Sequence, residues 1–336
     1  MRLRPGLPVL WRGPTEVQVG TDPRWAVTLS DLSPSAAMAL HAAPTGADVK
    51  KLRSLLAHEH VGAEETAQVL DHLASAHLLV DGLPGESAPD TVAWGIVAAD
   101  AAGRSVLAAR QRSSVRVVGL GRVGTALAGL LAGAGVGTVE LEDPGLVDPR
   151  DVGACGLLPR DVGAPRVAAA ARVLHDIAPG VRTTRGHRPV DLVVLVEDDV
   201  ADPVAYAPLL EDDVSHLSVV IREASVLVGP LVQPGRSACL RCADLHRTDL
   251  DPQWPAVATQ LASRDARRVV ETALAAVSSA LAAVQVLAHL DGRPTAVRDA
   301  SLELRLPDCL PRTLRWPPHR RCDCAGPPAE AGELSA

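Results

Sequence analysis

Short apolar runs open the chain, and longer runs with helical spacing follow them. The short runs are bounded by Gly, Pro and Asp and predict strands at 7–11, 16–20 and 25–29. The longer runs predict helices at 33–43, 48–59 and 63–76, followed by a strand and turn at 77–82. Ser33 or Ser35 is expected to cap the first helix, because a serine oxygen accepts a free backbone N–H there. The pattern predicts a small winged-helix-like α+β domain over residues 1–82.

Residues 83–108 predict a linker and a helix. The stretch from Leu83 to Asp90 is rich in Pro, Gly and Ser, which is typical of a linker. A helical pattern follows at 94–109. At the other end of the chain, residues 327–336 are expected to form a disordered tail.

Residues 109–326 alternate strand-length apolar runs with longer helical stretches. Strands are expected at 115–118, 138–143, 191–198, 216–221, 226–232 and 301–306. Helices are expected at 123–132, 163–177 and 267–290. Because strands that alternate with helices form parallel sheets covered on both faces, the pattern predicts a Rossmann-like α/β domain with a mostly parallel sheet.

Composition narrows the classes of partner. Of the 336 residues, 47% are hydrophobic and 22% are charged, which is typical of a core-forming protein. Phe is absent, Tyr206 is the only Tyr, and the net charge is −7, so we expect no nucleic-acid partner. The N-terminus lacks the apolar core of a signal peptide. The uncharged run 123–139 predicts a buried helix and strand, so we expect no membrane partner and a cytoplasmic location.

A glycine-rich turn lies between the predicted strand at 115–118 and the helix after it. Its glycines are Gly119, Gly121 and Gly124, and Asp143 ends the next predicted strand. Such a turn lets the backbone approach a phosphate group at a helix N-terminus, and the acid can bind ribose hydroxyls. The alternative is that the glycines only pack the helix against the strand and bind no ligand.

Two close pairs of cysteines lie far apart in the sequence. Cys239 and Cys242 form a C-x-x-C, and Cys322 and Cys324 form a C-x-C. Four thiolates complete a tetrahedral zinc site with no open position, so the pattern predicts a structural zinc ion that pins the C-terminal segment. The alternatives are two unrelated thiol pairs or a redox C-x-x-C, and His319 is a candidate substitute ligand.

Together these features resemble the ThiF / ubiquitin-activating-enzyme superfamily. The motifs that carry the resemblance occur in the family's order, at 119–124, 134–143, 163–166, 191–198 and 234–242, with the second cysteine pair after them. The resemblance covers residues 109–326 and implies the ThiF-type fold with its zinc site. Superfamily members bind ATP with magnesium and adenylate the C-terminal carboxylate of a small carrier protein. By position, the resemblance implies that Asp143 binds the ribose, Arg166 replaces a phosphate-binding lysine, and Asp198 binds magnesium.

The chain departs from the family at several nucleotide-binding positions. Arg122 interrupts the family's double glycine, and a second acid of the family falls on Gly145. The family's Ser-Asn-Leu-x-Arg-Gln stretch falls on residues 150–155, so its Asn and its catalytic Arg are missing. Arg110 or Arg112 is a candidate arginine finger, and the alternative is that both are ordinary surface residues. These departures predict a degenerate nucleotide site.

One branch of the superfamily keeps the fold and the zinc but lacks the ATP site. Its small N-terminal domain binds leader peptides and presents them to a YcaO cyclodehydratase. This chain is similar in layout, so we expect residues 1–82 to bind a precursor (leader) peptide or a carrier protein by strand addition. Alternatives for residues 1–82 are a dimerisation or packing domain and a DNA-binding winged helix. Members of the superfamily also pair as homodimers through the sheet domain.

Two enzyme classes remain as alternatives. Asp143, Arg166 and Asp198 favour an ATP-dependent adenylyltransferase for a ubiquitin-like or sulfur-carrier protein. The glycine turn with Asp143 also suits an NAD-dependent oxidoreductase, although nothing downstream supplies a hydride-transfer site. From the family layout, Trp254 and Pro255 are expected on a loop that covers the substrate channel.

Overall fold

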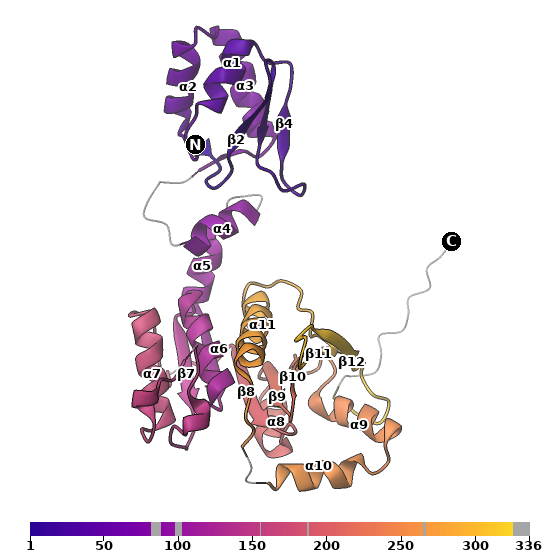
Figure 1. The fold of residues 1–336 in the computed structure, drawn as a ribbon. Helices are drawn as coiled ribbons and strands as arrows, with labels where there is room; N and C mark the ends of the chain where they lie inside the picture. Colours follow the sequence, from indigo (N-terminus) through magenta and orange to yellow (C-terminus); the bar gives the residue numbers. More distant parts are fainter. Residues whose placement is uncertain (82–88, 98–102, 155, 187, 265–266, 325–336) are drawn as a thin grey trace, which may run out of the picture. The chain divides into compact units, whose positions relative to one another are not determined.

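The computed structural model describes residues 1–81, 89–97, 103–154, 156–186, 188–264 and 267–324. Contacts between residues divide the chain into two units, Met1–Ala108 and Ala109–Ala336 (Figure 1). The predicted tail at 327–336 and most of the predicted linker lie outside the described residues.

The N-terminal unit combines a three-stranded antiparallel sheet with three helices. The sheet has the order β2 (Val9–Gly13), β3 (Glu16–Val19) and β4 (Val27–Leu29), so β2 and β4 are its edges. The helices are α1 (Pro34–His41), α2 (Val49–His58) and α3 (Ala63–Ser75). A short pair, β1 (Arg2–Leu3) with β5 (Leu79–Val80), joins its two ends. Ser33 caps α1 through Ala36 N, and Asp48 caps α2 through Lys51 N. The predicted α+β pattern is confirmed.

The single helix expected at 94–109 was wrong. The structure has two helices, α4 (Pro89–Val97) and α5 (Gly103–Arg112), and residues 98–102 between them are not described. A Cβ atom on Gly103 would lie 2.2 Å from the carbonyl oxygen of Thr91. The start of α5 therefore lies directly against α4, which only a glycine allows.

The second unit is built on a seven-stranded sheet with the order β12-β11-β10-β9-β8-β6-β7. The strands are β6 (Ser114–Val118), β7 (Thr138–Glu142), β8 (Leu192–Asp198), β9 (His216–Ile221), β10 (Ser225–Val232), β11 (Ala300–Arg305) and β12 (Arg312–Arg315). Strands β7, β6, β8 and β9 run parallel, and β10 to β12 extend the sheet antiparallel. The predicted Rossmann-like α/β fold is confirmed.

Helices cover both faces of this sheet (Figure 1). Residues of α6 (Arg122–Gly133), α7 (Arg166–Ile177) and α11 (Thr272–Leu290) share one core with Val194 of β8. Residues of α8 (Pro203–Glu211) and α9 (Leu240–Leu250) share another with Val193 and Leu195, because alternate strand residues face opposite sides. Helix α10 (Trp254–Ala262) contacts α9.

The start of α10 differs from the sequence-based prediction. Trp254 and Pro255 lie in the first turn of α10, so the prediction that they sit on a loop was wrong.

Among the described helices, only α11 is long and apolar enough to cross a membrane by composition, and half of its most apolar window is buried within the protein. Its buried residues pack against α6 and β10, as in a core helix.

Candidate functional site

The glycine turn joins β6 to α6, and packing alone requires two of its glycines. Gly119 has a φ of +90°, and a Cβ atom there would lie 2.2 Å from the carbonyl oxygen of Val196. A Cβ atom on Gly124 would lie 1.8 Å from the carbonyl oxygen of Gly119. Gly121 is the N-cap residue of α6. The turn therefore presses the helix onto the strands, as the packing interpretation expects.

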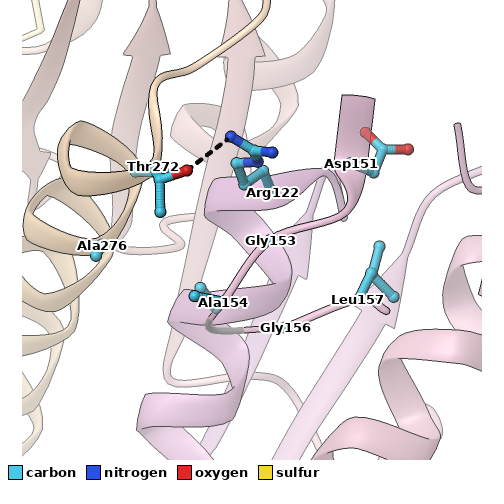
Figure 2. A pocket seen from close by; sticks show the side chains of 10 residues that line it. Arg122, Asp151, Gly153, Ala154, Gly156, Leu157, Thr272 and Ala276 are labelled. Atoms are coloured by element: carbon cyan, nitrogen blue, oxygen red, sulfur yellow. Dashed lines mark hydrogen bonds between the residues drawn. The ribbon is translucent and has the colours of Figure 1, made fainter. Parts of the chain in front are cut away.

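The Arg122 side chain fills the space beside the turn. Its guanidinium donates to the carbonyl oxygens of Val152 and Val270, the latter at 2.7 Å. It also reaches the Thr272 hydroxyl at 3.5 Å (Figure 2). A Cβ atom on Gly153 would lie 3.1 Å from Arg122 Nε, so the arginine stem lies directly over that glycine. Arg122 thus ties α6 to the loop after β7 and to the start of α11.

A small void lies beside this arginine. The cavity lined by Arg122, Asp151, Leu157 and Thr272 measures about 10 Å³ (Figure 2). A void of this size holds one water molecule at most.

Arg166 and two aspartates form a buried ion-pair network next to the turn. Arg166 donates to Asp151 at 2.7 Å and to Asp143 at 3.2 Å, and all three side chains are at most 8% exposed. Asp143 Oδ1 also accepts the Gly145 N–H at 2.7 Å, and Asp143 Oδ2 accepts the Leu120 N–H at 2.8 Å. The carboxylate predicted to bind ribose therefore already holds three partners within the protein.

Arg267 closes the network on the side of the glycine turn. Its guanidinium lies 3.5 Å from Asp151, and a Cβ atom on Gly121 would lie 3.1 Å from it. On the other side, a Cβ atom on Gly145 would lie 2.4 Å from Arg166. Guanidinium groups of the chain itself therefore lie directly against both Gly121 and Gly145.

The roles of Asp151 and Arg267 in this network were not predicted from the sequence. The signal for Asp151 was an acid at the position where the family has an uncharged Asn. A buried acid needs a cation, but the sequence does not reveal which of the many arginines supplies it.

Two acids at the end of β8 remain outside this network. Burial raises the pKa of Asp198, the expected magnesium ligand, to about 6. Burial also raises the pKa of its neighbour Glu197 to about 7. Glu197 Oε1 accepts the Asp202 N–H at 3.0 Å, while Oε2 is buried without a hydrogen-bond partner among the described residues. Asp199 pairs with Arg268, whose backbone N–H also partly offsets the shift of Asp198.

Arg110 is a structural residue. Its side chain is 1% exposed and its guanidinium binds both oxygens of Asp291, at 2.9 and 2.7 Å. The candidate role as an arginine finger is therefore wrong for Arg110, because the group is locked inside the fold. Arg112 is exposed at the end of α5.

The four cysteines meet in one cluster that can hold a metal ion. Their sulfur atoms all lie within 4.8 Å of one another, and those of Cys239 and Cys322 are 3.6 Å apart. Sulfurs bound at about 2.3 Å around a tetrahedral ion lie about 3.8 Å apart, so the cluster matches that geometry. Cys239 donates to Cys242, which lowers the pKa of the Cys242 thiol to about 4 and raises that of Cys239. The predicted assembly of the two pairs is confirmed.

His319 supports the cluster from outside. Its backbone N–H donates to Cys242 Sγ at 3.3 Å. Its ring nitrogens are engaged by Asp249, at 2.8 Å, and by the Arg321 N–H, at 3.1 Å. The histidine therefore orients a ligand and is not itself one of the four.

Comparisons with solved structures return proteins of the same architecture. Escherichia coli MccB solved with ATP matches with a TM-score of 0.65 at 13% identity, covering 96% of this chain and 99% of that chain. MccB with AMPCPP and MccA matches with a TM-score of 0.66 at 13% identity, over 97% and 100%. PaaA matches with a TM-score of 0.68 at 16% identity, over 92% and 98%. Identities this low establish a shared fold.

Curated protein sequences include no significant match to this chain. A family model does match, and it spans residues 96–326, which include the glycine turn, the ion-pair network and the cysteine cluster. This chain belongs to the ThiF family.

Proposed function

We propose that this protein is a ThiF-family scaffold that binds a precursor (leader) peptide or a small carrier protein and presents it to a partner enzyme of the YcaO type. The observation that carries the proposal is the filled space at the glycine turn. Arg267 lies against Gly121, Arg166 lies against Gly145, and the carboxylate of Asp143 is held by Arg166 and by two backbone N–H groups. Adenylation needs a bound nucleotide, and a nucleotide needs a cavity of several hundred Å³. The proposed protein therefore binds and does not adenylate.

Zinc is the metal that we propose for the cysteine cluster. Four thiolates with tetrahedral spacing suit zinc, and they leave no position for a substrate. The ion holds the segment after β12 against the start of α9. Its role in the proposal is structural.

The N-terminal unit supplies the peptide-binding edge in this proposal. Both β2 and β4 are edge strands, so each has a row of backbone groups without a strand partner on one side among the described residues. An extended peptide can add as a further strand to such an edge. The solved relatives support a peptide or protein partner, since MccB was solved with MccA and is described as a microcin C7 biosynthetic enzyme.

Titration of ATP tests the central claim. Mg-ATP is titrated calorimetrically into the full chain loaded with zinc, with E. coli MccB as the positive control because it was solved with ATP. We expect no binding by this protein and no pyrophosphate exchange with carrier proteins. Micromolar binding would overturn the proposal and favour the second candidate, an ATP-dependent adenylyltransferase. The same titration with NADH tests the oxidoreductase alternative.

The peptide arm of the proposal has its own test. A peptide selected against the full chain from a displayed random library is added, and backbone hydrogen exchange is compared with and without it. We expect slower exchange in β2 or β4. Slower exchange only in the second unit would remove the proposed role of residues 1–82. Homodimer formation and the cytoplasmic location stay predictions, and sedimentation velocity tests the first of them.

A further inference from the structure

A second cavity lies in the sheet unit, away from the glycine turn. It measures about 570 Å³, and it lies between the start of α8, helix α9 and helix α10. The loop that carries Val200 and Ala201 follows β8 directly, so the cavity opens near the carboxyl end of a parallel strand. Ligands of α/β sheets bind at that end, and pockets for small ligands measure about 300–1,000 Å³.

Apolar side chains form most of the cavity wall. Among these side chains are Val204, Leu245, Trp254 and Ala258. Trp254 is held rigidly, because its indole N–H donates to Asp244 at 3.1 Å and the Arg247 guanidinium lies 5.3 Å from its ring centre. Val204 is 81% exposed at the start of α8. A rigid apolar wall with an exposed apolar side chain favours an aliphatic or aromatic group as the occupant.

One charged group of the wall has no ion pair within the part of the chain that the structure describes. Arg241 lines the cavity and makes no hydrogen bond or ion pair with any other described residue. The two acids of the wall are already used. Asp244 accepts from Arg247 at 2.9 Å and from Trp254, and Asp202 caps α8 through Val204 N at 2.9 Å. Arg241 is therefore the group in this wall that a carboxylate can neutralise.

Phosphate is a poorer candidate for the same wall. A phosphate group is attracted by a free helix N-terminus, but the N-terminus of α8 carries the Asp202 carboxylate as its cap. A single guanidinium is also less charge than a di- or triphosphate requires. A carboxylate next to an apolar group fits both the charge and the lining.

We infer that this cavity binds an internal peptide segment in which an apolar side chain neighbours an acidic one. The inference rests on the proposed function, because it assigns part of the peptide partner to a place in the sheet unit. The volume exceeds that of one side chain, so two or three residues enter. The apolar side chain packs on Trp254 and Leu245, and the acidic side chain pairs with Arg241.

Fluorine NMR of the full chain tests this inference directly. The chain contains five Trp, so labelling with 5-fluorotryptophan gives few signals, and Trp254→Phe assigns the one in the cavity wall. The probes are two blocked dipeptides, acetyl-Leu-Glu-amide and acetyl-Leu-Gln-amide. We expect the Glu probe to shift the Trp254 signal with saturation and to bind about tenfold more tightly than the Gln probe, since a charge-assisted hydrogen bond is lost in the latter.

Two pairs of variants complete the test. Ala258→Phe fills the cavity and is expected to abolish the shift, whereas Ala256→Phe, on the same helix but outside the lining, leaves it unchanged. Neither variant threatens folding, because α10 has no buried residue. Arg241→Gln is expected to remove the preference for the Glu probe, and the exposed Arg236→Gln is its control.

Several outcomes would overturn the inference. These are an unmoved Trp254 signal at millimolar probe, equal affinity for the two probes, and binding only of a dipeptide with a free C-terminal carboxylate. The signal reports the cavity and not the glycine turn. ATP binding would therefore contradict the proposed function without changing the Trp254 signal. Absence of probe binding in the cavity would contradict this inference without changing the result of the ATP titration.

Discussion

Arg166 shows how a residue type associated with phosphate binding becomes part of the structure. Its guanidinium lies between two carboxylates that are at most 8% exposed. Burying a charge is costly unless it is paired, and here each charge is the partner of another. The network therefore makes the protein sensitive to the loss of any one member.

Removing one member of the network is expected to be severe. Arg166→Gln leaves Asp143 buried without a cation and Asp151 with only Arg267, at 3.5 Å, which costs about 3–5 kcal/mol of unfolding free energy. Asp151→Asn alone is also destabilising, but the double variant is expected to cost less than the sum by about 1–3 kcal/mol. Urea denaturation of the four proteins measures this coupling energy. Strictly additive costs would show that the pair is not coupled.

Glu197 predicts a dependence of stability on pH. Its pKa rises from 4.5 to about 7 on folding, so the folded protein holds a proton that the unfolded chain releases. Below about pH 4.5 both states are protonated and nothing is lost. As pH rises toward 7, the unfolded chain ionises first, so this group lowers stability by at most about 3 kcal/mol. Above pH 7 both states are ionised and the loss is complete.

The variant Glu197→Gln isolates this effect. Its amide oxygen can still accept the Asp202 N–H, but the side chain does not titrate. We expect the variant to gain stability relative to the parent protein between pH 5 and about pH 7.5, measured by urea denaturation. Glu64→Gln, at an exposed position of α3, is the control. It should leave the change in unfolding free energy between the two pH values the same as in the parent protein. If the unfolding free energy of Glu197→Gln and of the parent protein changed equally with pH, the raised pKa of Glu197 would be contradicted.

Arg122 connects three elements that the sequence separates. One guanidinium binds the loop after β7 at Val152 and the start of α11 at Val270, and its own backbone begins α6. The start of α11 is thereby fixed on the glycine turn. This connection lies where the family has its double glycine.

Restoring glycine at this position is expected to loosen the junction. Arg122→Gly loses the hydrogen bonds to both carbonyl oxygens and costs about 2–4 kcal/mol. Hydrogen exchange should quicken at residues 149–153 and in the first turn of α11. Arg112→Ala, at an exposed position, should change stability by less than about 0.5 kcal/mol. Unchanged exchange at α11 in Arg122→Gly would mean that other contacts hold the junction.

The cysteine cluster joins the start of α9 to the segment after β12. These elements are separated in the sequence by α10, α11, β11 and β12. Metal binding by such a cluster stabilises the folded state relative to the unfolded chain, because the unfolded chain does not hold the four sulfurs together.

Loss of one ligand is expected to free the C-terminal segment. Cys322→Ser should lower the metal content well below one zinc per chain and quicken hydrogen exchange in residues 312–324. Strands β6 to β9 should keep their protection, because the core that they share with α6, α7 and α11 does not include the cluster. Cys309→Ser, outside the cluster, is the matched control. Elemental analysis and hydrogen exchange measure both quantities. A full zinc complement in Cys322→Ser would contradict the four-sulfur site.

Across the whole molecule, elements with periodic apolar spacing could be predicted from the sequence. Ion pairs between residues that are distant in the sequence could not. The strands and helices of both units follow apolar spacing, and the cysteine spacing predicted the cluster. Helices α8, α9 and α10 and strand β12 were not predicted, and α10 has no buried residue and therefore no apolar face toward a core. Arg267 was missed because its partner Asp151 is fixed only by the folded sheet. The cavity beside Arg241 is likewise formed by three helices that meet only after folding.

The ion-pair network at the glycine turn also has an evolutionary consequence. A lineage that opened a nucleotide pocket here would have to change several of these residues together, because loss of Arg166 alone leaves Asp143 buried without a cation and loss of Asp151 alone removes the partner that Arg166 binds at 2.7 Å. Each single step is therefore selected against for its loss of stability, even where the full set of changes is tolerated. The network is therefore expected to restrain change at this turn, so that its members are replaced together or retained together.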